Sequence, residues 1–149
     1  NEEQGLYGGK AYAAKHAEQV SKHQLGAESD FGAGRIYAFN TGAPAHARAA
    51  TQQIAEALAP LGIDYAPEKG GPGPDISPFA AQGLSWAWLA QDGSDYFDLH
   101  HNADDTLDKI DPKALPQNVA AYTVFAYLAA EADGDFGSAV KAPANAATK

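Results

Sequence analysis

The sequence predicts an α/β fold in which a largely parallel, mixed sheet is flanked by helices. Short runs of strand-forming residues alternate with longer stretches of helical periodicity along the 149 residues. This alternation is typical of sheets whose strands are joined by helical connections. Glycine- and proline-rich turns separate the segments, and a chain of this length fits one domain or a large piece of one.

The first half of the chain is expected to contain two helices and a strand. Apolar residues recur at three- and four-residue spacing over 12–20, directly after the Gly-Leu-Tyr-Gly stretch at 5–8, and they predict a helix. Residues 34–40 are rich in strand formers. A second apolar stripe predicts a helix over 45–60, which the following Gly62 would end.

The second half is expected to begin with a loop, because residues 66–78 are rich in glycine and proline. The apolar run at 85–89 suits a buried strand. The Asp-Pro pair at 111–112 has the pattern of a helix N-cap and first helical residue, and we expect this helix to run to Ala130. Residues 141–149 are expected to form a flexible tail.

Composition excludes several classes of partner. The net charge of −9 and the sequence pI near 4.8 disfavour nucleic acid and anionic membrane surfaces. No apolar run approaches the roughly 20 residues of a membrane helix, so we expect no membrane insertion. The chain has no cysteine, so any metal must be held by His, Asp or Glu. It also lacks methionine, and we therefore expect Asn1 to follow an N-terminal portion of the same protein.

Four acidic residues are candidates for chemistry. The adjacent carboxylates of Glu2 and Glu3 would point in different directions at a strand end, so that one could bind a metal while the other transfers protons. Asp30 lies between two apolar stretches, and a carboxylate at the C-terminal end of a strand is well placed for a site in an α/β fold. Glu28 is a near neighbour that could be confused with Asp30. An ordinary turn or surface role stays open for each of them.

His100 and His101 are the candidate imidazole ligands. A neutral imidazole is a common zinc ligand, and its second nitrogen usually needs a carboxylate or carbonyl partner. Asp105 could supply that support or cap the turn. Adjacent histidines on a strand diverge, so the two are not expected to ligate one ion together. With the acidic candidates, they form a set of oxygen and nitrogen ligands suited to zinc, although a surface pair stays open.

Three motifs, spaced in this order, make the chain similar to family twenty-eight of the metallopeptidases. Asn1-Glu-Glu-Gln-Gly-Leu-Tyr-Gly-Gly9 resembles the family's glutamate-pair motif. Gly73-Pro-Asp-Ile-Ser-Pro-Phe79 is similar to its substrate-side loop. Leu99-His-His-Asn-Ala-Asp-Asp-Thr-Leu-Asp-Lys-Ile-Asp111 resembles its last ligand motif. The resemblance is to the bacterial aminopeptidase and plasma glutamate carboxypeptidase type.

This resemblance implies that residues 1–140 form the C-terminal portion of a catalytic domain with the zinc-exopeptidase, phosphorylase/hydrolase-like fold. It also implies substrate-binding roles for Asp75, Ser77 and Phe79. The family's bridging Asp and an upstream His ligand would both precede Asn1. We therefore expect the site to be incomplete in this chain, and the chain alone to be inactive.

The resemblance further implies a role for each candidate at the metal site. Glu2 would be the general base. Glu3 and His101 would bind the first of two zinc ions, and Asp30 would bind the second. Asp105 would support His101 from outside the set of ligands, and the histidine before His101 would not be a ligand.

The implied function is hydrolysis of a peptide bond by a metal-dependent exopeptidase, an aminopeptidase or a dipeptidase, acting on a peptide or dipeptide. Two alternatives stay open. One is a glutaminyl cyclase-like enzyme with a single zinc, and the other is a non-catalytic peptidase homologue used for binding. Retention of all four implied site residues argues against the latter. The resemblance also implies a periplasmic or secreted location, and no signal peptide is visible.

Overall fold

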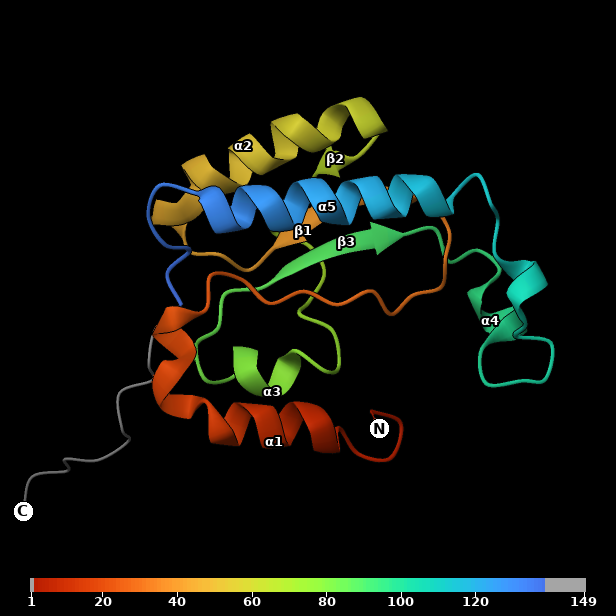
Figure 1. Ribbon diagram of the computed structural model, residues 1–149, viewed down its shortest axis with the longest axis horizontal. Coiled ribbons are helices and arrows are strands. Elements are labelled where there is room, and N and C mark those ends of the chain that lie inside the picture. Colours follow the sequence, from red (N-terminus) through yellow and green to blue (C-terminus); the bar gives the residue numbers. More distant parts are fainter. Residues whose placement is uncertain (1, 139–149) are drawn as a thin grey trace, which may run out of the picture.

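The computed structural model describes residues 2–138, so the tail expected at 141–149 lies outside the described residues. Helices and short strands alternate along this part of the chain (Figure 1). Their bounds are α1 (Tyr7–Lys15), η1 (Ala17–Lys22), β1 (Ile36–Thr41), η2 (Ala45–Ala47), α2 (Arg48–Leu58), η3 (Ala59–Leu61), β2 (Asp64–Tyr65), α3 (Ser77–Ala80), β3 (Ala87–Gln91), α4 (Tyr96–Leu99), η4 (Leu107–Lys109) and α5 (Leu115–Glu131), where η denotes a 3-10 helix.

The strands form one sheet in the order β2-β1-β3, with β1 at its centre. β1 pairs with β2 in parallel and with β3 in antiparallel, and Phe39 lies opposite Leu89 in the antiparallel pair. A further parallel bridge joins Gly26 to Trp86, just before β3. The extended segment at 25–30 therefore runs beside β3 and in the same direction.

The mixed α/β sheet is confirmed, and its antiparallel share is larger than the sequence predicted. Parallel neighbours need a long crossover, and α2 supplies it between β1 and β2. The connection over 31–35 is too short for such a crossover, so the chain reverses there and β1 runs against the segment at 25–30. The start of β1 and the end of β3 consequently lie together, where Asp92 N–H donates to the Arg35 carbonyl at 2.8 Å.

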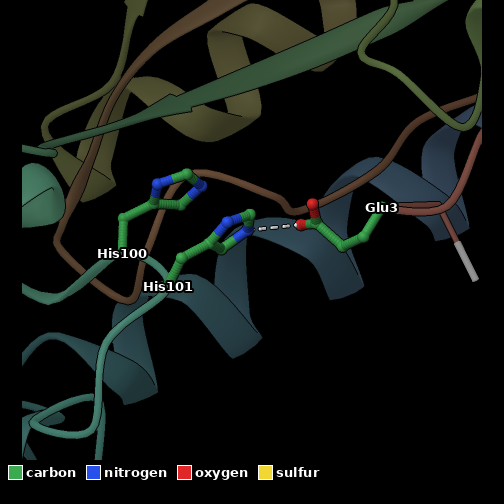
Figure 2. Close-up of side chains that lie close together, drawn as sticks. All are labelled: Glu3, His100 and His101. Atoms are coloured by element: carbon green, nitrogen blue, oxygen red, sulfur yellow. Dashed lines mark hydrogen bonds and ion pairs between the residues drawn. The ribbon is translucent and has the colours of Figure 1, made fainter.

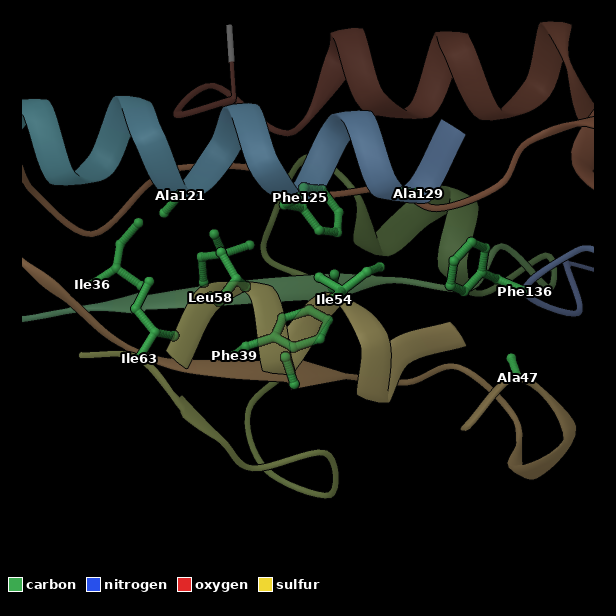
Figure 3. Packing of buried hydrophobic residues seen from close by; sticks show 13 residues of the cluster. Ile36, Phe39, Ala47, Ile54, Leu58, Ile63, Ala121, Phe125, Ala129 and Phe136 are labelled. Carbon is green, nitrogen blue, oxygen red and sulfur yellow. The ribbon is translucent and has the colours of Figure 1, made fainter. Parts of the chain in front are cut away.

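α2 and α5 pack on one face of the sheet and bury the larger core between them and β1 (Figure 3). α2 contributes Ile54 and Leu58, which are spaced by one helical turn, and α5 contributes Phe125. Full burial of a side chain of this size stabilises a fold by about 1.5–3 kcal/mol. The buried members of this core are Ile36, Phe39, Ala47, Ile54, Ala55, Leu58, Ile63, Ala87, Leu89, Ala121, Phe125, Ala129 and Phe136.

Two adjacent polar side chains of α5 are buried against the strand ends. Gln117 Oε1 accepts a hydrogen bond from Ile36 N–H at 2.9 Å, and its Nε2 donates to the Ile36 carbonyl at 2.7 Å. Asn118 Oδ1 accepts from Gln91 Nε2 at 2.7 Å, and its Nδ2 donates to the Gly34 carbonyl at 2.9 Å. These bonds fix α5 over the start of β1 and the end of β3.

α1 and α3 pack together, and the segment at 25–30 runs between them and β3 (Figure 1). A Cβ atom on Gly9 of α1 would lie 2.6 Å from the Asp75 carbonyl oxygen, so only glycine allows this close approach. Within residues 2–138, every helix is too short or too polar to cross a bilayer. The second, smaller core consists of Ala13, Val20, Phe79 and Leu84.

Several boundaries differ from the sequence prediction. The helix expected through Val20 ends at Lys15 and gives way to η1. α5 begins at Leu115, because Asp111 caps a turn ahead of the helix, where its Oδ1 accepts from Lys113 N–H at 2.8 Å. The prediction missed α3, α4 and β2, since elements of four residues or fewer show no periodicity to detect.

Candidate metal centre

Glu2 and Glu3 lie in a tight turn directly before α1. The Glu2 carbonyl accepts hydrogen bonds from Gly5 N–H at 2.9 Å and from Leu6 N–H at 2.8 Å. Leu6 has a φ of 58°, in the left-handed region, and its carbonyl accepts from Lys10 N–H in the first turn of α1. The left-handed conformation costs about 1–2 kcal/mol for an L-residue. The turn therefore fixes the direction in which both carboxylates leave the backbone.

His100 and His101 follow α4, and His100 N–H donates to the Tyr96 carbonyl at 2.8 Å. His101 has a φ of 58°, which is again left-handed. The two imidazole rings stack, with centroids 3.7 Å apart and planes at 20°. The expectation that the adjacent side chains diverge is wrong, because the two residues follow a helical turn instead of lying on a strand, and His101 is left-handed.

Glu3 meets both histidines although 98 positions separate it from His101 (Figure 2). His101 Nε2 lies 2.7 Å from Glu3 Oε1, and the ring N–H donates to the carboxylate. One ligand atom from each of Glu3, His100 and His101 lies within 4.8 Å of the other two. No other group of three or more such side chains gathers as closely in the part of the chain that the structure describes.

This donor set fits zinc. Two imidazole nitrogens and one carboxylate oxygen are typical zinc ligands, at about 2.0–2.2 Å from the ion in a tetrahedral arrangement. All three side chains are exposed, so a metal and a substrate could reach them from solvent. His100 joins this group although the resemblance implies that it is not a ligand. No local signal in the sequence shows this, since its position depends on the backbone conformation of His101.

Asp30 and Asp105 line the same cavity as the cluster, which has a volume of about 380 Å³. Asp30 comes from the segment at 25–30 and is not one of the three clustered ligands. Among residues 2–138, no side-chain hydrogen bond joins Asp105 to His101, so the expected support of the imidazole is not formed. The structure thus brings Glu3, Asp30 and His101 to one cavity from three separate segments.

The carboxylates around this cavity act on one another. Loss of water around Glu2, followed by the charges of Glu3, Asp30 and Asp75, raises the pKa of the Glu2 carboxyl. Burial, followed by the charges of Asp75 and Glu3, raises the pKa of Asp30. The hydrogen bond from His101 lowers the pKa of Glu3. Glu3 is therefore ionised under ordinary conditions, and the concentrated negative charge favours a bound cation.

The three residues expected to bind substrate lie in different surroundings. Asp75 is exposed, and it is close enough for its charge to act on Glu2. Ser77 Oγ donates to the Pro74 carbonyl at 2.9 Å and stabilises the turn into α3. Phe79 is only 4% exposed and packs in the second core. The geometry gives Phe79 a packing role, and its contact with substrate stays a prediction.

Comparison with known proteins shows which family the chain belongs to. The chain matches the family model described as Peptidase family M28 over residues 1–127. The chain belongs to peptidase family M28. It is also similar to a solved M28 structure, a Peptidase M28 precursor from Shewanella amazonensis SB2B, with a TM-score of 0.87 and 44% sequence identity. The alignment covers 95% of this chain and 32% of that precursor.

The chain is also similar to Carboxypeptidase Q proteins of several vertebrates. It is 32% identical over 132 residues to Carboxypeptidase Q of Mus musculus, an alignment that covers 89% of this chain and 28% of that protein. It is 34% identical over 135 residues to Carboxypeptidase Q of Xenopus laevis, covering 87% of the chain and 28% of the relative. The M28 chain described here thus spans less than a third of the length of these proteins.

Proposed function

We propose that the chain contributes part of the active site of a metal-dependent exopeptidase, an aminopeptidase or a dipeptidase. The observation that carries this proposal is the cluster of Glu3, His100 and His101, with Glu2 next to it in the sequence. Membership of family M28 supports a peptidase. The excess of carboxylates around the cluster supports a cation as the cofactor.

The chain's own residues have distinct tasks in this proposal. Glu3 and His101 hold one zinc ion, and Asp30 contributes to a second, which the full-length protein completes with further ligands. Zinc supplies a Lewis acid that polarises the scissile carbonyl and lowers the pKa of a water molecule. Glu2 accepts the proton of the attacking water and passes it to the leaving amine. The raised pKa of Glu2 suits both steps, because it brings the carboxyl closer to the pH at which it works.

Substrate entry follows from the position of the cavity. The three clustered side chains are exposed, and together with Asp30 and residues of α4 they line the cavity of about 380 Å³. A dipeptide or the end of a longer peptide is the substrate we propose. By the resemblance to its family, we also propose a periplasmic or secreted location, which fractionation of the source cells tests.

The test is a metal and activity analysis of the full-length protein that contains this chain. We expect two zinc ions per chain by elemental analysis, and hydrolysis of dipeptides or aminoacyl substrates that a chelator abolishes and zinc restores. One zinc per chain together with cyclisation of N-terminal glutamine would point instead to a glutaminyl cyclase-like enzyme. Bound zinc without turnover on either substrate class would contradict an enzymatic role.

A further inference from the structure

Glu28 connects two segments that border the candidate metal centre. It lies two positions before Asp30, on the extended segment whose Gly26 N–H donates to the Ser85 carbonyl at 2.9 Å. The Glu28 carbonyl accepts a hydrogen bond from Tyr122 Oη at 2.7 Å. The backbone at Glu28 is therefore anchored to α5 on one side and, through Gly26, to the chain before β3 on the other.

The Glu28 side chain reaches in the opposite direction, to the loop that precedes α3. Its Oε2 accepts hydrogen bonds from the N–H groups of Asp75 at 2.9 Å and of Ile76 at 3.2 Å. Bonds from backbone N–H groups to a carboxylate are stronger than bonds between neutral groups. The other oxygen, Oε1, is buried and has no hydrogen-bond partner among residues 2–138.

The loop backbone is shaped around this carboxylate. Gly73 has a φ of +85°, and a Cβ atom there would overlap Oε1 of Glu28. Gly70 has a φ of +77°, and a Cβ atom there would overlap the ring of Trp88. Asp30, Pro74 and Trp88 line a cavity of about 260 Å³ together with Glu28. One wall of this cavity thus belongs to the segment that ends at Asp30, and the other belongs to the loop that Glu28 holds.

We propose that Glu28 is a positioning residue, which holds the turn at 73–76 against the segment ending at Asp30. It thereby fixes the wall of the cavity of about 260 Å³, which shares Asp30 with the cavity at the metal centre and against which one end of the substrate binds. The inference rests on the proposed exopeptidase function. Among the described residues, the hydrogen bonds of Glu28 go to Asp75, Ile76 and Tyr122 and not to Glu3, His100 or His101. Loss of Glu28 should therefore weaken substrate binding while metal binding and the chemical step remain.

Two readouts on the zinc-loaded full-length protein test this role. Glu28→Ala should raise KM for a dipeptide about tenfold, the scale of one charge-assisted hydrogen bond, with kcat within about twofold and zinc content unchanged. Glu28→Gln should leave KM near the unsubstituted value, because the amide oxygen can accept the hydrogen bonds from both backbone N–H groups. Hydrogen exchange of the peptide spanning 73–79 should accelerate in Glu28→Ala and not in Glu28→Gln.

Substitutions at other positions show whether the effect of Glu28→Ala comes from the lost hydrogen bonds to the turn at 73–76 or from a general change in the protein. Gly73→Ala should reproduce the faster exchange and the raised KM, since it displaces the carboxylate without altering its charge. Gly71→Ala should leave the exchange unchanged, because a Cβ atom there meets no atom of the described residues within 4 Å. Glu18→Ala, which removes an exposed carboxylate in η1, controls for net charge and should leave both readouts unchanged.

The possible results test the positioning role of Glu28 and the proposed exopeptidase function separately. An unchanged KM in Glu28→Ala, or a raised KM accompanied by loss of zinc, would overturn the positioning role. If hydrogen exchange of the peptide spanning 73–79 is unchanged in both Glu28→Ala and Gly73→Ala, Glu28 does not hold the turn at 73–76. If the unsubstituted protein hydrolyses none of the substrates, the proposed function fails, and the exchange data still decide whether Glu28 holds the turn.

Discussion

His101 Nε2 lies 2.7 Å from Glu3 Oε1, across 98 positions of sequence. Left-handed residues lie at both ends of this contact: Leu6 follows the glutamate turn, and His101 is itself left-handed. Strained backbone conformations of this kind persist where the surrounding structure holds them, and they concentrate at functional sites. The contact thus depends on two turns that local propensity alone would not favour.

The buried amide of Gln117 should be essential for the attachment of α5. Gln117→Leu leaves the N–H and the carbonyl of Ile36 without partners, so we expect the free energy of unfolding to fall by about 2–3 kcal/mol. Urea denaturation of the full-length protein measures this. Gln53→Leu, at an exposed position of α2, is the matched control and should change the value by less than about 0.5 kcal/mol. Equal effects of the two substitutions would show that the amide bonds contribute nothing.

Tyr122 should make stability depend on pH in the alkaline range. Its hydroxyl donates to the Glu28 carbonyl, and burial raises the pKa of the phenol above its usual value near 10. The neutral form is therefore favoured in the folded state. This stabilisation is fully present below the unfolded pKa and is lost as pH rises through the folded pKa.

Tyr122→Phe should accordingly lower the free energy of unfolding by about 1 kcal/mol near neutral pH. The difference from the unsubstituted protein should shrink or reverse above about pH 10. Denaturation curves at a series of pH values measure it, with Tyr127→Phe at an exposed position as the control. A difference that stays constant through the alkaline range would rule out this contribution of the phenol.

The sequence was most informative where the pattern is long. The stripe over 45–60 predicted α2, and the strand formers at 34–40 predicted β1, because each buries one face in the larger core. The amides of Gln117 and Asn118 gave no such signal. A polar residue within a helical pattern indicates an exposed face, and only the tertiary structure brings backbone groups of β1 within reach of these two.

The candidate site was predicted in part, and for reasons that the structure makes clear. Motifs placed Glu3, Asp30 and His101 together by resemblance, and all three line one cavity. The position of His100 beside Glu3 and His101 could not be predicted, because it follows from the left-handed backbone of His101, which no local pattern in the sequence indicates. Phe79 lies in a motif similar to a substrate-side loop, yet its apolar ring is needed to fill the second core.

The isolated chain of 149 residues should bind one zinc at most. Its described residues supply a single cluster of ligands, and Asp30 alone is a weak site for a second ion. We expect about one zinc per chain by elemental analysis after equilibration with excess zinc, and negligible hydrolysis of aminoacyl or dipeptide substrates. Two tightly held zinc ions with ordinary turnover would show that the chain contains a bridging ligand of its own and would contradict this expectation.

Zinc content and turnover distinguish the roles of the two adjacent glutamates. In the full-length protein, zinc content by elemental analysis and kcat for a dipeptide are measured for Glu2→Gln and Glu3→Ala. Glu2→Gln should keep its zinc and lose at least about a hundredfold in kcat, since it removes only the base. Glu3→Ala should lose zinc together with activity, because it removes a ligand. Equal loss of zinc in both variants, or full zinc content in Glu3→Ala, would contradict the assignment of Glu3 to the metal and Glu2 to the proton.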